Sequence, residues 1–277
     1  MQMFLLRLVA KLPFCLIDPL AWLLYLLVCH VFKYRKGVVT TNIRQAFPQF
    51  SEAEVRCLSK RFYRHLTQLF LEMIKAYEMS ASEFQTRCTI TGQEVLFAET
   101  QNQTRPVIIL TTHQGNWEWM LHGASLHLDF PIDPVYKPLH HRGMNQFIYE
   151  VRSQFNSIPV PMKQVGKNIL KQKHFRLFVM LADQRPGSEE QSYPSVFLNK
   201  EAKFFTGAER IVKFTQYPVF FAKCKKIRTG YYGLEFIKLS GSDPDSDYPV
   251  MDAYIKEAEA SIHDQPETYL WSHQRWK

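Results

Sequence analysis

The most constraining feature of this chain is the run Val107-Ile108-Ile109-Leu110-Thr111-Thr112, which is apolar and largely β-branched. A short continuous run of this kind is typical of a strand buried on both faces, as in a parallel sheet covered by helices. The polar turn His113-Gln114-Gly115-Asn116 follows directly, and the segment from Trp119 to about Leu128 resembles a helix. A buried strand that leads through a short turn into a helix is typical of an α/β fold.

Strand-like and helix-like segments alternate along the rest of the chain. Ser51 with Glu54, and Thr206 with Glu209, have the capping-box spacing that marks a helix start. The strand-like segments are 89–92, 134–136, 175–182, 218–222 and 232–237, and the helix-like segments are 51–79, 93–101, 144–155, 206–214 and 252–262. This alternation predicts an α/β domain with a mixed central sheet flanked by helices.

The N-terminal segment indicates contact with a membrane. Residues 1–32 are largely apolar, and their cleanest run, Pro19 to Phe32, has about 14 residues where roughly 20 are needed to cross a bilayer upright. The basic cluster Lys33-Tyr34-Arg35-Lys36 comes next and favours a cytoplasmic location for the following chain. We predict a membrane-anchoring helix within residues 1–36 and a globular domain over 37–277. A buried core helix is the alternative, and the pattern leaves open whether the segment spans the bilayer or lies in its plane.

Charge and cysteine content narrow the partners and the kind of site. The net charge of +8 favours anionic partners, namely phospholipid headgroups, phosphorylated substrates, an acidic carrier protein or nucleic acid. No RNP-like motif supports RNA binding, so we expect no nucleic-acid partner. The five cysteines are scattered and include no CxxC pair, which argues against a disulfide scaffold and a cysteine-based zinc site. The histidines have no regular spacing with carboxylates, and we predict no metal.

Several common catalytic and nucleotide-binding motifs are absent from the sequence. It contains no GxSxG elbow, which excludes an ordinary α/β-hydrolase. The patterns GxxxxGK[ST], GxGxxG and HExxH are also missing, which argues against a common nucleotide-binding fold and against a zincin metalloprotease. We therefore expect chemistry that depends on side chains without a cofactor.

His113 and Glu118 are the strongest candidates for that chemistry. Inside one continuous helix, positions five apart lie roughly 140° round the axis and could not face each other, whereas across a turn they can converge. Asn116 is a favourable N-cap, which places Glu118 in the first helical turn, where the helix dipole stabilises a charged carboxylate. We predict that Glu118 bonds one ring nitrogen of His113 while the other accepts a proton from an attacking hydroxyl or amine. A histidine and a glutamate that lie near each other by chance are the simpler alternative.

Further motifs occur in an order that is familiar as a set. They are 41–48 (Thr-Asn-Ile-Arg-Gln-Ala-Phe-Pro), Val135-Tyr136-Lys137-Pro138, Arg152, Ala182-Asp183-Gln184, Ser195-Val196-Phe197 with Phe204-Phe205-Thr206-Gly207, and the ending 269–277 (Tyr-Leu-Trp-Ser-His-Gln-Arg-Trp-Lys). Together with His113 and Glu118, which match an HxxxxE signature, this set resembles the bacterial late lipid A acyltransferases of the lysophospholipid acyltransferase superfamily. The resemblance extends from about residue 20 to the end. The chain departs from that branch in its shorter length, in Lys137 where arginine is usual, and in Arg185-Pro186-Gly187 after the Asp-Gln pair.

The resemblance implies a glycerol-phosphate acyltransferase-like fold and the transfer of a fatty acyl group from a thioester to a hydroxyl. The donor would be acyl carrier protein or coenzyme A, and the acceptor a phosphorylated glycolipid that is a lipid A precursor. The enzyme would work at the bacterial inner membrane, with its catalytic domain facing the cytoplasm and His113, oriented by Glu118, as general base.

The remaining candidate residues would bind substrate or stabilise charge. We predict that the backbone amides of Gly115 and Asn116, or the guanidinium of Arg152, stabilise the tetrahedral oxyanion. Arg152 could equally bind a phosphate of the acceptor or of the carrier's phosphopantetheine. Asp183 ends a strand that should neighbour the strand of His113, and it could orient Arg152 or a substrate hydroxyl.

Two alternatives to this function stay open. The same chemistry could serve another acceptor, such as a different glycolipid, an aminolipid or a lysophospholipid. A membrane-associated lipid-binding protein that retains the fold without catalysis is the second alternative.

Overall fold

A computed structural model of the chain describes residues 2–100, 106–130, 132–139, 141–171, 175–187, 190–240 and 245–276. The end of the segment predicted as a helix over 93–101, and Lys277 of the C-terminal motif, lie outside these residues. The α-helices are α1 (Gln2–Ala10), α2 (Phe14–Leu26), α3 (Lys36–Ala46), α4 (Glu52–Lys75), α5 (Ala81–Arg87), α6 (Gln93–Glu99), α7 (Trp117–Leu128), α8 (Arg142–Arg152), α9 (Val165–Lys171), α10 (Gly207–Thr215) and α11 (Pro249–Asp264). One π-helical turn, η1 (Leu27–Val31), and two short 3-10 helices, η2 (Met162–Gln164) and η3 (Pro266–Thr268), complete the helices of this part of the chain.

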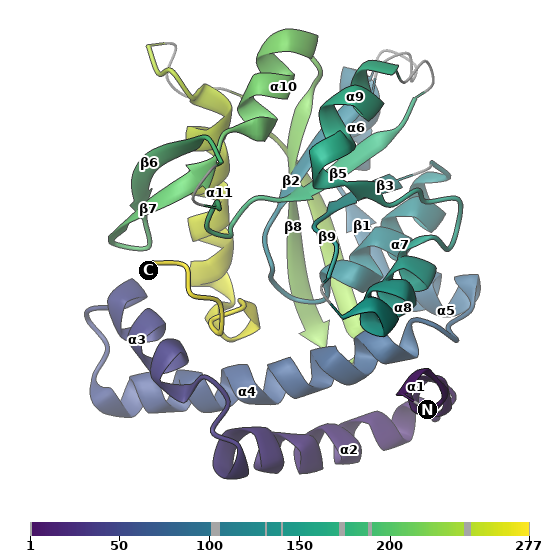
Figure 1. Ribbon diagram of the computed structural model, residues 1–277, viewed down its shortest axis with the longest axis vertical. Helices are drawn as coiled ribbons and strands as arrows, with labels where there is room; N and C mark the ends of the chain where they lie inside the picture. Colours follow the sequence, from purple (N-terminus) through teal and green to yellow (C-terminus); the bar gives the residue numbers. More distant parts are fainter. Residues whose placement is uncertain are drawn as a thin grey trace.

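The strands form one large sheet and one hairpin. They are β1 (Cys88–Thr91), β2 (Val107–Thr111), β3 (Ile132–Tyr136), β4 (Val160–Pro161), β5 (Leu177–Leu181), β6 (Ser192–Phe197), β7 (Lys200–Phe205), β8 (Val219–Arg228) and β9 (Tyr231–Lys238). The seven-stranded sheet has the order β1-β9-β8-β2-β5-β3-β4, and β6 pairs with β7 separately (Figure 1). Its strands pair in parallel except for β8 with β9, so the predicted mixed α/β sheet flanked by helices is confirmed.

Strand β2 lies in the middle of the sheet and separates two hydrophobic cores. All five of its residues are buried. Ile108 and Leu110 belong to the core that includes α11, and Val107 and Ile109 belong to the core that includes α7. Side chains alternate between the faces of a strand, so a strand covered by helices on both faces must be apolar throughout.

Helix starts show where local sequence patterns hold and where they fail. The Ser51–Glu54 capping box is present in the structure, with both reciprocal hydrogen bonds formed at the start of α4. The box predicted for Thr206 and Glu209 is wrong, because the Thr206 side chain makes no cap bond. The Glu209 carboxylate instead accepts the amide of Met251, at 2.9 Å, in α11. A tertiary contact has replaced the local one.

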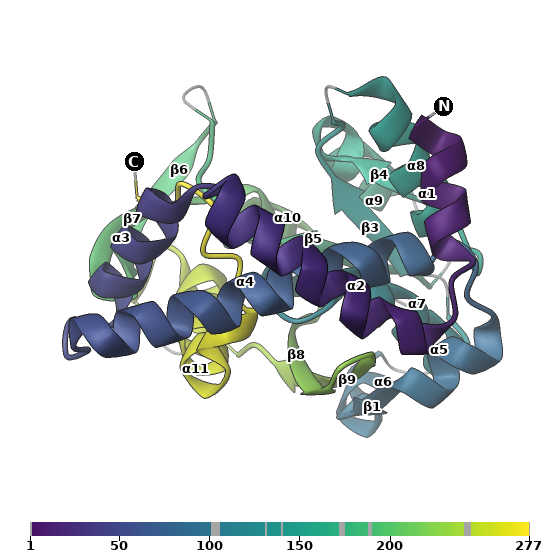
Figure 2. The ribbon, with the colours of Figure 1, turned by 90° about the horizontal axis from the view of Figure 1, so that it is seen from below.

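Helix α4 connects the sheet to the N-terminal helices. It lies across the end of the sheet toward which β8 points, with α2 packed beneath it and α1 near its C-terminal end (Figures 1 and 2). Ile17 and Ala21 of α2 pack against Leu71 of α4. The 18 residues Phe14–Val31 are apolar enough and long enough to cross a membrane, with a mean hydropathy of 1.9, and 22% of them are buried. The N-terminal segment therefore has one face on the protein and one face free.

Candidate active site

A large cleft opens at the carboxyl ends of the parallel strands β2, β5 and β3. It has a volume of about 470 Å³, and its walls include His113, Tyr136, Lys137, Arg152, Gln184 and Arg185. Ligands of open α/β sheets bind at the carboxyl ends of the strands because the loops there are free to carry functional side chains. Two residues singled out by the sequence, His113 and Arg152, therefore line the same cavity.

The ring of His113 is held by Asp183. Nδ1 of His113 lies 2.7 Å from Oδ1 of Asp183, and the main-chain amide of His113 donates to Oδ2 at 3.1 Å. An ionised carboxylate can only accept, so Nδ1 carries a proton, and in the neutral ring the lone pair is therefore on Nε2. Burial alone raises the pKa of the Asp183 carboxyl, but the adjoining His113 ring and amide hold that pKa below its ordinary value. Asp183 is thus an ionised orienter for His113.

Glu118 does not occupy the place predicted for it. It lies in the first turn of α7, capped by Asn116 as predicted, with Oδ1 of Asn116 accepting the amide of Trp119 at 3.1 Å. Its carboxylate, however, is bonded by Nε and Nη2 of Arg152, the former at 2.9 Å, and by the indole of Trp117 at 3.1 Å. The prediction that Glu118 bonds His113 is therefore wrong. The α7 turn directs this carboxylate toward α8, where Arg152 lies.

The two carboxylates have different partners from those predicted from the sequence. Asp183 orients His113, and Glu118 holds Arg152 through a bidentate ion pair. Burial alone raises the pKa of Glu118, but the guanidinium of Arg152 brings it below its ordinary value. The pair is therefore charged and forms one wall of the site.

The backbone amides predicted as oxyanion donors already have partners. The Gly115 amide donates to the carbonyl of Thr268 at 3.0 Å, and the Asn116 amide bonds the thiol of Cys224. Gly115 itself has a φ of +62°, and a Cβ at this position would lie 2.5 Å from the sulfur of Cys224. The turn is thus tightly packed against β8 and the C-terminal segment, and these two amides are not free to bind an oxyanion.

Helix α4 holds the turn from below with two buried side chains. Nε2 of His65 lies 3.2 Å from the carbonyl oxygen of Gly115. The Glu72 carboxylate accepts Nδ2 of Asn116 at 2.9 Å and the hydroxyl of Tyr232 at 2.6 Å. Burial raises the pKa of Glu72 and lowers that of His65 to about 3, so His65 is neutral. These contacts fix the turn and the start of α7 in one position.

Sequence reasoning missed several residues that shape the site. Gln184, noted only as part of a motif, places Nε2 at 3.1 Å from Nε2 of His113. His65 and Glu72 follow the apolar positions Leu58, Phe62 and Leu69 of α4 at steps of three or four. Polar residues on an apolar helical stripe need buried partners, and this was the signal that could have identified them. Among the described residues, no three or more His, Cys, Asp or Glu side chains cluster closely enough to hold a metal ion.

Comparison with known proteins identifies similar chains. The profile of the family described as "Bacterial lipid A biosynthesis acyltransferase" matches residues 1–277. A protein of Haemophilus influenzae named "Lipid A biosynthesis acyltransferase" is 24% identical over 285 residues, an alignment that covers 97% of this chain and 84% of that protein.

Proposed function

The chain belongs to the bacterial lipid A biosynthesis acyltransferase family, and from this premise we propose that it moves a fatty acyl chain from an acyl thioester to a hydroxyl of a lipid A precursor, with His113 as general base and Asp183 as its orienter. The observation that carries the mechanism is the 2.7 Å contact between Nδ1 of His113 and Oδ1 of Asp183 at the edge of the cleft. The arrangement leaves Nε2 as a base that faces the bound acceptor.

The reaction needs one proton transfer in each direction. Nε2 of His113 takes the proton of the acceptor hydroxyl as its oxygen attacks the thioester carbonyl carbon. Asp183 stabilises the imidazolium, and the tetrahedral intermediate collapses when the carbon–sulfur bond breaks and the thiolate takes the proton back. Nε2 of Gln184 lies 3.1 Å from Nε2 of His113, so the acceptor hydroxyl must replace this contact.

Arg152 is the donor that we assign to the oxyanion. Glu118 bonds Nε and Nη2, which leaves Nη1 for a ligand in the cleft. Because Glu118 holds the guanidinium rigidly and the pair is buried, the donor needs little reorganisation during the reaction. The role of Glu118 in this mechanism is to position Arg152.

The polar parts of the substrates would bind at the mouth of the same cleft. Lys137 and Arg185 both line it and supply positive charge for a phosphorylated glycolipid or for the phosphopantetheine of an acyl carrier protein. A net charge of +8 suits both of these acidic partners. Coenzyme A carries phosphates as well and is the other donor that fits this charge.

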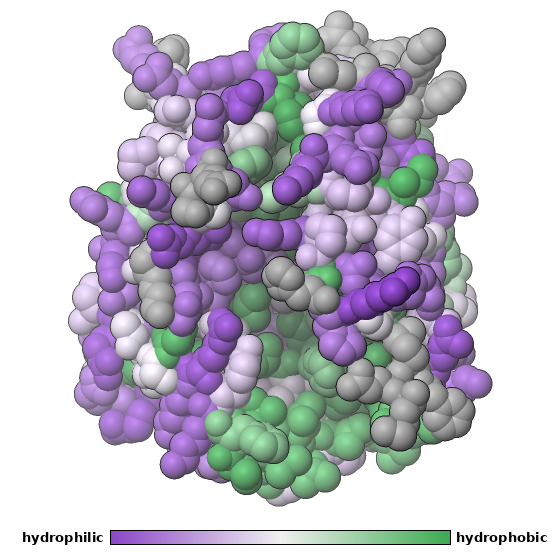
Figure 3. All heavy atoms as spheres, viewed as in Figure 1, coloured by the Kyte–Doolittle hydropathy of each residue, from purple (hydrophilic) through white to green (hydrophobic). Residues whose placement is uncertain are grey.

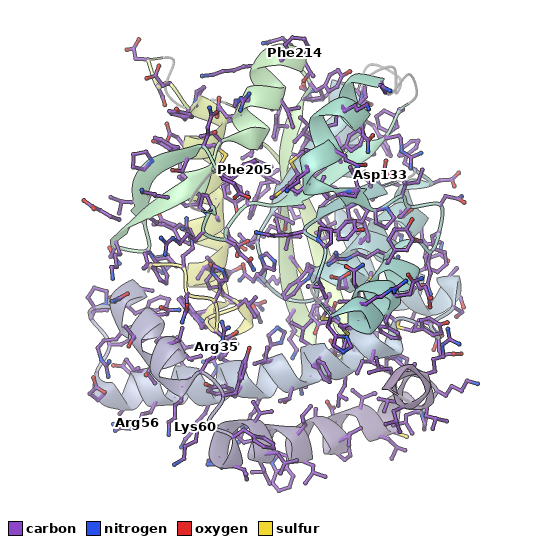
Figure 4. The ribbon with its side chains drawn as sticks, viewed as in Figure 1. Arg35, Arg56, Lys60, Asp133, Phe205 and Phe214 are labelled. Atoms are coloured by element: carbon purple, nitrogen blue, oxygen red, sulfur yellow. The ribbon has the colours of Figure 1, made fainter. Side chains whose placement is uncertain are left out.

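We also propose that the N-terminal helices lie in the plane of the inner membrane with the cleft on the cytoplasmic side. Trp22, Leu23 and Leu27 are exposed on the face opposite α4, and Figure 3 shows apolar side chains gathered over α2. Arg56 and Lys60 lie on α4 next to one end of this apolar face (Figure 4), whereas the guanidinium of Arg35 donates to the carbonyl of Ser272. An apolar face next to basic residues is the pattern of an in-plane helix on an anionic leaflet.

Mass spectrometry of membrane lipids tests this function. We compare cells that lack the protein with cells that contain the wild type, His113→Ala or the control His263→Ala, whose ring is exposed on α11 and does not line the cleft. We expect a lipid A species lighter by one acyl group in the deletion and His113→Ala strains only. Unchanged lipid A together with a change in another lipid would show that the acceptor is that other lipid. No altered lipid in any strain would favour the non-catalytic alternative.

A further inference from the structure

A second cavity lies between α4 and α8, on the other side of α8 from the cleft. It has a volume of about 260 Å³ and is lined by Phe70, Met73, Ile74, Glu118, Met144, Phe147, Ile148 and Val151. Apart from Glu118, every lining side chain is apolar. Phe70 is 46% exposed, whereas Ile74, Phe147 and Val151 are buried. We call this cavity the α4–α8 groove.

Helix α8 is the partition between the groove and the cleft. Asn145 and Arg152 line the cleft, Met144 and Val151 line the groove, and Ile148 lines both. The Glu118–Arg152 ion pair lies at this partition near the end of α8, and Arg152 lines the cleft while Glu118 lines the groove. The two cavities therefore meet at residues of the proposed catalytic site.

A line of side-chain contacts leads from the general base to the groove. The rings of His113 and Trp117 are in edge contact, with centroids 5.1 Å apart, and the Trp117 indole donates to Glu118 at 3.1 Å. The single side chain of Trp117 thus separates the ring of His113 from Glu118 on the wall of the groove. Along the axis of α8, Val151 and Met144 are seven residues apart, which is about 10 Å. The groove thus offers length along one direction.

The chemistry of the lining specifies an uncharged and apolar occupant. The only charge on the wall is that of Glu118, and Arg152 and Trp117 already bond it. A phosphate or a sugar would find no free partner among the described lining residues and would lose its hydration there. Met73 of α4 and Met144 of α8 both line the groove, and their flexible side chains can adapt to a chain of methylenes.

The two helices that form the groove also pack against the apolar N-terminal helices. Helix α1 packs against both α4 and α8, and α2 packs along α4 (Figure 2). Arg7 of α1 contacts Glu150 of α8 at 3.4 Å and lies over the ring of Tyr77 just beyond α4. Both walls of the groove therefore contact helices of the N-terminal segment that we assign to the membrane, whereas the polar cleft lies on the other side of α8.

We propose that the α4–α8 groove binds the fatty acyl chain of the thioester donor and that Met73, Met144 and Phe70 set the chain length transferred. This inference rests on the acyl transfer proposed above and adds where the acyl chain lies. Of the two substrates, the donor fits because its carbonyl carbon must lie beside His113 while its chain, without polar atoms, extends past Trp117. The glycolipid headgroup of the acceptor, with its hydroxyls and phosphates, needs the polar cleft.

The test compares chain-length profiles of variants that fill or open the groove. Met73→Trp and Met144→Trp fill it from opposite walls, Phe70→Ala opens its exposed end, and Tyr149→Trp is the matched control on the exposed face of α8. We measure kcat/KM with acyl thioesters from octanoyl to stearoyl at constant acceptor. Each filling variant should lower kcat/KM for the longest accepted chain at least about tenfold relative to shorter chains. Phe70→Ala should admit longer chains, and Tyr149→Trp should leave the profile unchanged.

A second measurement does not depend on turnover. The affinity of acyl thioesters of increasing length is measured by calorimetry on His113→Ala protein, with and without Met144→Trp. The assignment is supported if the affinity rises with chain length and reaches its plateau at a shorter chain in the double variant. This result would support the groove as the acyl-chain site even if the protein does not catalyse the transfer proposed above. Chain-length profiles that stay unchanged in all variants overturn it, and so does an effect confined to the KM of the acceptor, which would assign the groove to an acyl chain of the acceptor.

Discussion

Asp183→Asn should remove most of the activity while leaving the fold in place, because it replaces a carboxylate by an amide of the same shape. Asp183 is 1% exposed, and both of its oxygens accept hydrogen bonds from His113. An asparagine can keep the bond to the main-chain amide through its oxygen. Its NH2 group then faces Nδ1, which forces the proton of His113 onto Nε2 and makes that nitrogen a donor in place of a base.

The size of the loss follows from the charge that is removed. During the reaction His113 becomes an imidazolium next to the Asp183 carboxylate, and two opposite charges about 4 Å apart gain roughly 4 kcal/mol at an effective dielectric constant near 20. The loss of that term corresponds to about a 10³-fold decrease in kcat. The KM values should change much less, because Asp183 is not among the residues that line the cleft.

The assay combines steady-state transfer kinetics with ¹⁵N NMR of the His113 ring. Asp183→Asn should shift the tautomer of His113, whereas Glu118→Gln should leave the tautomer unchanged because Glu118 bonds Arg152 and Trp117. If Asp183→Asn keeps kcat within tenfold of wild type, the assigned orienter is wrong. If Glu118→Gln shifts the tautomer and Asp183→Asn does not, the pairing originally expected from the sequence holds in solution.

Further predictions concern the ion pair, the turn and the membrane face. Glu118→Gln leaves the Arg152 guanidinium buried without its counter-charge, which should cost roughly 3–5 kcal/mol of unfolding free energy in urea denaturation, and adding Arg152→Met should recover much of this. The pKa of Glu118 is lowered in the folded protein, so the stabilisation by this carboxylate is complete at pH values above its ordinary pKa of 4.5 and is lost as the pH falls below that value. The melting temperatures of wild type and Glu118→Gln should therefore converge in acid. Gly115→Ala combines a left-handed φ with a 2.5 Å contact to a buried sulfur, so overpacking alone should lower the free energy of unfolding by roughly 1–3 kcal/mol and lower the Tm with it. An unchanged Tm would contradict the packing described for the turn. Replacing both Trp22 and Leu23 by serine should leave the Tm nearly unchanged and reduce sedimentation with anionic vesicles at least about tenfold, and full binding would refute the in-plane face.

Much of the architecture could be predicted because it depends on neighbours along the chain. The apolar run 107–112 became the central buried strand β2, and Asn116 became the N-cap of α7. Ser51 and Glu54 formed their capping box. The hairpin of β6 and β7 was not predicted as strands, since Ser195-Val196-Phe197 was recognised only as part of a family motif. Its strands pair with each other outside the large sheet, and part of its surface is exposed, so the apolar signal is weak.

The chemistry of the site could be predicted as a set of residues but not as a set of partners. The sequence by itself determined that His113 ends a buried strand, that Glu118 opens the following helix and that Asp183 ends another strand. Only the tertiary structure decided which carboxylate meets the histidine. Parallel pairing sets Thr111 opposite Leu181, so the residues two positions beyond them, His113 and Asp183, arrive side by side at the same edge of the sheet. Strand register is a long-range property, and a spacing of five residues along the chain contains no information about it.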